Sequence, residues 1–162
     1  MTAALTILTM ICLGYITVQD FKERKVYWFL FPLVIILLGL VHFLNTAAPL
    51  AFFNYILLNT LFVSVIISVL YLFTRIIIKK KFLNHGLGLG DILFFYAFAL
   101  GFPTVTFVIL FANAILFALL LFLVSKKRLH LRTVPLAGLM GLFLILVFIY
   151  NLIFQSPPLY GY

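Results

Sequence analysis

The stretch from Thr104 to Val124 has the sequence TVTFVILFANAILFALLLFLV, 21 residues without a charged side chain. The hydrocarbon core of a bilayer is about 30 Å thick, and a helix that rises about 1.5 Å per residue needs roughly 20 apolar residues to cross it. This segment therefore has the length and the composition of a transmembrane helix. It indicates that the chain is an integral membrane protein.

The rest of the chain has the same apolar character. Of its 162 residues, 67% are hydrophobic and 9% are charged, whereas soluble domains are roughly half apolar and one quarter charged. A soluble fold could not bury this much apolar surface. Because the composition does not shift at any point that would mark a linker, we expect residues 1–162 to form one membrane-embedded domain.

Six apolar segments are expected to cross the bilayer as α-helices. They are Ala3–Val18, Val26–Leu44, Leu50–Ile78, Leu83–Phe102, Thr104–Val124 and Thr133–Phe154. The expected fold is therefore all-α, a polytopic bundle of about six transmembrane helices. Gly101-Phe102-Pro103 leaves two alternatives open, because it either turns the chain between two helices or kinks one long helix of a five-span protein.

The connections between the segments alternate in charge. All 11 lysine and arginine residues fall within 22–25, 75–81 and 126–132. With six spans these connections share one face, which the positive-inside rule makes cytoplasmic, with both termini on the outer side of an inner (plasma) membrane. Five spans would put 126–132 outside, so that arrangement is disfavoured. Orientation at the membrane then explains the net charge of +8, and no nucleic-acid partner is expected.

The chain has only three acidic residues, Asp20, Glu23 and Asp91. A charge in or beside hydrocarbon costs a few kcal/mol, so each of these residues needs a reason. Asp20 ends the first span, and Asp91 follows a glycine-rich run, His85 to Gly90, at the start of the fourth span. The expected topology brings both aspartates to a similar depth at the cytoplasmic face.

Each aspartate also has an ordinary structural interpretation. Asp91 could cap the helix that it opens, and Asp20 could pair with a neighbouring lysine or arginine. Their combination favours a functional interpretation, because two neighbouring carboxylates do not readily ionise together, so that one keeps its proton while the other activates water. Gly88 and Gly90 would let the backbone bend and a substrate approach closely, although tight helix packing explains glycines equally well.

Other protease chemistries lack their motifs in this chain. There is no H-E-x-x-H zinc motif and no G-x-S-x-G serine motif. The single cysteine, Cys12, and three scattered histidines have no metal-site spacing, so neither a metal ion nor an organic cofactor is expected. His85 is close to Asp91 in the sequence, but a lone interfacial histidine is more often incidental, and His42 is expected to face the other side.

Two motifs resemble those of the prepilin peptidase family, the type IV leader peptidases among the GxGD aspartyl intramembrane proteases. They are Gly88-Leu89-Gly90-Asp91 and Asp20-Phe21-Lys22-Glu23-Arg24-Lys25-Val26. Val134-Pro135-Leu136-Ala137-Gly138 resembles the start of the last span of the family more weakly. Together with six expected spans, the resemblance covers nearly the whole chain.

The resemblance implies an aspartic-type endopeptidase that removes short basic leaders from type IV prepilin-like precursors at the cytoplasmic membrane face, without a cofactor. Asp20 and Asp91 would be the catalytic pair, and Gly88 and Gly90 would shape the active-site loop. Glu23 would help to recognise a basic leader, although a surface ion pair also explains it.

Three features depart from the family pattern. The chain lacks the cytoplasmic segment with paired cysteines, so N-methyltransferase activity is not expected. Leu93 stands where many bacterial members have lysine, and Val26-Tyr27-Trp28 replaces the usual Ile-Pro-Asn, which leaves the substrate range open. The alternative to a peptidase is a non-catalytic membrane assembly component or a small proton- or cation-coupled transporter.

Overall fold

The computed structural model describes residues 2–23, 25–78, 87–129, 134–154 and 158–161. Within these ranges the regular structure is helical, which confirms the expected all-α fold. The elements are α1 (Thr2–Lys22), α2 (Leu30–Asn45), α3 (Pro49–Phe73), the π-helical turn η1 (Thr74–Ile78), α4 (Leu89–Leu100), α5 (Thr104–Leu129) and α6 (Leu136–Phe154). The six α-helices correspond to the six expected apolar segments.

Four of these helices are long and apolar enough to cross a bilayer. They are α1, α3, α5 and α6, with spans Thr2–Lys22, Pro49–Ile76, Thr104–Ser125 and Leu136–Phe154. The protein is therefore a membrane protein. The two other helices, α2 and α4, have 16 and 12 residues, and 12 residues of helix rise only about 18 Å.

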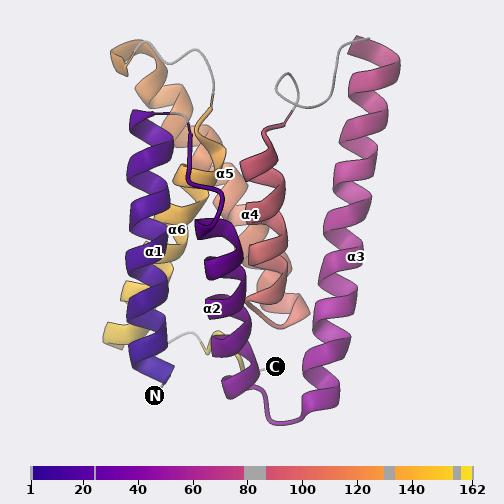
Figure 1. Ribbon diagram of the computed structural model, residues 1–162, viewed down its shortest axis with the longest axis vertical. Helices are drawn as coiled ribbons and strands as arrows, with labels where there is room; N and C mark the ends of the chain where they lie inside the picture. Colours follow the sequence, from indigo (N-terminus) through magenta and orange to yellow (C-terminus); the bar gives the residue numbers. More distant parts are fainter. Residues whose placement is uncertain (1, 24, 79–86, 130–133, 155–157, 162) are drawn as a thin grey trace.

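The chain turns at Gly101-Phe102-Pro103. α4 ends at Leu100, three non-helical residues follow, and α5 begins at Thr104 and runs back in the opposite direction (Figure 1). The prediction of a turn is confirmed, and the kinked long helix of the five-span alternative is not formed. α1 differs slightly from its expected bounds, because it continues past Val18 to Lys22 and so includes Asp20 in its last turn.

Both termini lie at one end of the bundle, and α1, α3 and α5 all end at the other (Figure 1). That second end therefore carries Lys22 of α1, Arg75 of η1 and residues 126–128 of α5. At the end with the termini, the connections at 46–48 and 101–103 contain no charged residue. The described basic residues thus gather at one end, as the charge pattern predicts.

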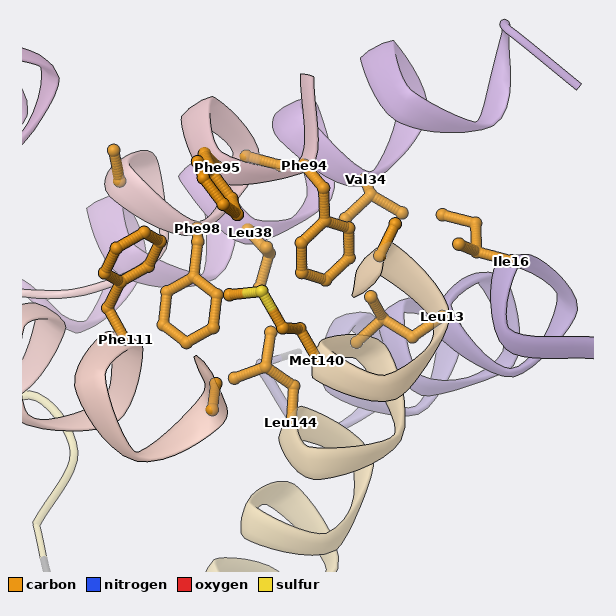
Figure 2. Close-up of a cluster of buried hydrophobic side chains, with 14 of the residues drawn as sticks. Leu13, Ile16, Val34, Leu38, Phe94, Phe95, Phe98, Phe111, Met140 and Leu144 are labelled. Carbon is orange, nitrogen blue, oxygen red and sulfur yellow. The ribbon is translucent and has the colours of Figure 1, made fainter. Parts of the chain in front are cut away.

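The interior is filled by aliphatic and aromatic side chains from all six α-helices, part of which Figure 2 shows in close-up. They include Leu13, Ile16, Val34, Leu38, Phe94, Phe95, Phe98, Phe111, Met140 and Leu144. Phe98 of α4 lies at the centre, with its ring centroid 5.6 Å from that of Phe111 and 6.1 Å from that of Phe107. Lipid is as apolar as these side chains, so the helices gain little by hiding them from lipid and are held together by close packing. The same packing encloses the short helix α4.

Polar side chains hold the end of α4 that lies far from Asp91. The last carbonyl groups of a helix have no partner within it. The Asn59 amide of α3 donates to the carbonyl oxygens of Ala99 and Phe102, both at 2.9 Å. His42 Nδ1 of α2 lies 2.9 Å from the carbonyl oxygen of Leu100. His42 is therefore at the opposite end of α4 from Asp91, as expected, and these contacts tie the end of α4 to α2 and α3.

Candidate functional site

Asp20 and Asp91 meet at the first turn of α6. This helix begins directly after Pro135, and the first N–H groups of a helix have no partner within it. The Ala137 N–H donates to Asp91 Oδ1 at 3.0 Å, and the Gly138 N–H donates to Asp20 Oδ2 at 2.7 Å. Because the donors are consecutive, the two carboxylates lie side by side, close enough for the charge of Asp20 to act on Asp91.

The carboxylate of Asp91 accepts hydrogen bonds from backbone N–H groups at the N-termini of two helices, α4 and α6. Asp91 is the third residue of α4, and its second oxygen, Oδ2, accepts a hydrogen bond from the N–H of Gly88 at 3.2 Å. The interpretation of Asp91 as the N-cap residue is therefore wrong, because Gly88 holds that position, but the Asp91 carboxylate still caps its own helix by accepting from the N-cap N–H. Its other oxygen binds α6, where the positive end of the helix dipole favours a negative charge, so capping and pairing with Asp20 occur together.

The motif glycines are explained by close approach of other groups. A Cβ on Gly88 would lie 3.1 Å from Asp91 Oδ2, and a Cβ on Gly90 would lie 3.0 Å from Cζ of Phe31. At Gly138 a Cβ would lie 3.0 Å from both Cβ and Oδ2 of Asp20. Gly138 therefore does more than let two helices pack, because it leaves the space in which the Asp20 carboxylate lies.

Thr17 joins α1 to α6 one turn before Asp20. Its hydroxyl lies 2.8 Å from the carbonyl oxygen of Leu13 and 3.1 Å from that of Gly138. Sequence reasoning missed Thr17, since a threonine in an apolar helix usually bonds its own backbone. It also gave Ala137 and Gly138 no role in the site, and their only signal was the weaker motif that begins at Val134.

The carboxylates border a cleft of about 930 Å³. Its wall is mostly apolar and comes from the connection after α1, from α2, from the segment around the start of α4, from one face of α5 and from the start of α6. The apolar lining residues are Val26, Trp28, Phe31, Leu87, Leu89, Leu93, Ile115, Leu119, Val134, Leu136 and Ala137. An apolar cleft with a few convergent polar groups is typical of a binding site.

The cleft brings together four of the five residues that the sequence singles out. Asp20, Asp91, Gly88 and Gly90 all line it. Glu23 is exposed and lies outside the cleft wall, whereas Lys25 lines it. His85, which follows 79–84 outside the described residues, is not placed relative to Asp91.

The chemistry available at this site is that of a carboxylate pair. Among the described residues, no three histidine, cysteine, aspartate or glutamate side chains come together as metal ligands. Comparison of the chain with protein-family models, curated proteins and solved structures finds no match. The two aspartates and their cleft are therefore the features of the molecule that bear on its function.

Proposed function

We propose that this protein is a membrane aspartyl endopeptidase in which Asp20 and Asp91 form the catalytic dyad. The observation that carries the proposal is that two of the three acidic residues of the chain lie side by side at a cleft. Residues far apart in the sequence would not meet there by chance packing of apolar helices, since each charge in such a bundle has a cost.

The reaction follows from a pair of carboxylates that shares one proton. The ionised carboxylate takes a proton from a water molecule, whose oxygen attacks the scissile carbonyl carbon, while the protonated carboxyl donates to the carbonyl oxygen. The tetrahedral intermediate then breaks its C–N bond as the leaving nitrogen takes a proton from the dyad. The N–H groups of Ala137 and Gly138 orient the carboxylates for these steps.

The proposed substrates are type IV prepilin-like precursors, which would lose a short basic leader at the cytoplasmic face of the inner (plasma) membrane. The resemblance of 20–26 and 88–91 to prepilin peptidase motifs supports this substrate class. Support for the cytoplasmic face comes from the aspartates, which belong to the same end of the bundle as the described basic residues.

The apolar packing between the dyad and the opposite end of the bundle disfavours a transporter. A proton- or cation-coupled carrier needs a polar path from one end of the bundle to the other. The turns of α4 that follow Asp91 instead place Phe94 and Phe98 in the core, each with 0% of its surface exposed. The cleft therefore fits a reaction at one membrane face better than passage through the bundle.

The first test is cleavage of a prepilin-like precursor by the purified chain in lipid vesicles. We expect a product that is shorter by the leader, identified by mass spectrometry, and no product with protein-free vesicles. The same vesicles are loaded with a pH-sensitive dye. Intact precursors together with proton flux across the vesicle membrane would contradict the proposal and favour the transporter.

The proposed orientation predicts which connections are reached from each side of the membrane. Cys12 is buried, so Cys12→Ser gives a background for single cysteines at the exposed positions Ala47, Lys22 and Arg75. In intact cells a membrane-impermeant maleimide should label Ala47→Cys. It should label Lys22→Cys and Arg75→Cys only after the inner membrane is opened, and the reverse pattern would contradict the orientation.

A further inference from the structure

Lys25 brings a positive charge to the cleft. Of the basic residues in the described part of the chain, it is the one that lines the wall, where it joins Asp20 and Asp91. It lies in the connection between α1 and α2, and its side chain is exposed. Glu23, two residues earlier, lies outside the wall, so in the described part of this connection the charged side chain at the cleft is a lysine and not the glutamate expected from the sequence.

The segment that carries Lys25 is fixed to α1. Gln19, which is only 8% exposed, accepts a hydrogen bond through Oε1 from the Tyr27 N–H at 3.1 Å. The residues next to this bond, Val26 and Trp28, also line the cleft. A segment held at Gln19 and packed along the wall keeps the backbone of Lys25 beside the cleft, so that its exposed side chain stays within reach of a bound substrate.

We propose that Lys25 makes the cleft favour an acidic side chain close to the scissile bond and disfavour a basic side chain there, so that the basic residues of the proposed leader bind outside the cleft. This inference rests on the proposed peptidase function and names a specificity-determining residue for it. If its three dimensions are similar, a cleft of about 930 Å³ is about 10 Å across, which roughly three extended residues span. The acidic residue therefore lies within three positions of the scissile bond.

The size of the preference follows from the position of Lys25. An exposed ion pair changes an equilibrium by roughly fivefold at most. The apolar walls of the cleft lower the local dielectric constant and focus the field of the charge. We therefore expect about a fivefold higher kcat/KM for glutamate than for glutamine at the responsive substrate position, and a lower value for lysine.

The test uses precursors with glutamate, glutamine or lysine at each of three positions on both sides of the scissile bond. They are cleaved by the wild type and by Lys25→Gln, Lys25→Glu and Lys25→Arg. The glutamate preference should vanish in Lys25→Gln, become a lysine preference in Lys25→Glu and persist in Lys25→Arg. Lys22→Gln is the matched control, because Lys22 is an exposed lysine at the end of α1 that does not line the cleft, and it should keep the wild-type preference.

Binding of the same peptides, measured by fluorescence anisotropy, separates this inference from the proposed function. Charge selectivity in binding that depends on Lys25, without any cleavage, would overturn the peptidase and uphold the role of Lys25. Cleavage or binding with the same charge preference in wild type, Lys25→Gln and Lys25→Glu would overturn the role of Lys25. So would a wild type that shows no charge preference at any of the six positions.

Discussion

Asp20→Asn and Asp91→Asn are each expected to slow leader cleavage by about a thousandfold, because an amide can neither take a proton from water nor return it to the leaving nitrogen. Asparagine keeps the size of aspartate, and its carbonyl oxygen can still accept from Gly138 at position 20 or from Ala137 at position 91, where only the weaker bond from the Gly88 N–H is lost. The fold should therefore survive, and the measurement is the initial rate of cleavage by purified variants in lipid, together with the midpoint of thermal unfolding.

The double variant distinguishes a catalytic dyad from two separate carboxylates. Residues that act as one unit are strongly non-additive, so Asp20→Asn combined with Asp91→Asn should be about as slow as either single variant. A purely structural role predicts the opposite pattern, in which the variants unfold at lower temperature but cleave at the wild-type rate when folded. Cleavage retained by either single variant would defeat the dyad mechanism.

The positions of the helices could be predicted from the sequence because the bilayer sets their length and composition. α5 begins at Thr104 and α3 at Pro49, within one residue of the expected starts, since a Gly-Pro turn and a proline mark these points. The fourth segment shows the limit of this reasoning. It was expected from Leu83, which lies outside the described residues, but Leu87 and Gly88 are not helical and α4 begins at Leu89, because apolar residues among glycines do not distinguish a helix from extended backbone.

The sequence predicts that Asp20 and Asp91 lie at a similar depth in the membrane, but it does not predict how they are paired. What brings the carboxylates together is a pair of backbone N–H groups on α6, and a backbone donor leaves no mark in a side-chain motif. A similar cause explains why Lys25 lines the cleft and Glu23, which was expected there, does not. Which residue of a short connection faces the site depends on the hydrogen bond from Tyr27 to Gln19, which is a tertiary contact.

Gly138→Ala is the substitution outside the dyad from which we expect the largest loss of activity. The new Cβ would lie 3.0 Å from Oδ2 of Asp20 and 3.3 Å from the backbone carbonyl oxygen of Thr17. Because the backbone of α1 yields poorly, the carboxylate must move. A displacement of this kind at a reacting group lowers the rate by up to about a hundredfold, while the overpacking costs about 1–3 kcal/mol of stability. The measurements are kcat on the precursor and the midpoint of thermal unfolding.

Substitutions of two other glycines distinguish a loss of activity caused by displacement of Asp20 from a loss caused by general damage to the helix packing. Gly141→Ala disturbs the same contact between α1 and α6, with its Cβ 3.1 Å from Thr17 Oγ1, but Asp20 is not among the three atoms nearest to the new Cβ. Gly39→Ala in α2 meets no atom within 4 Å and should leave rate and stability unchanged or raise stability slightly. If Gly141→Ala lost as much activity as Gly138→Ala at equal loss of stability, helix packing would explain both effects. A loss confined to Gly138→Ala assigns the effect to Asp20, because of the two substitutions in this interface only that one displaces the carboxylate.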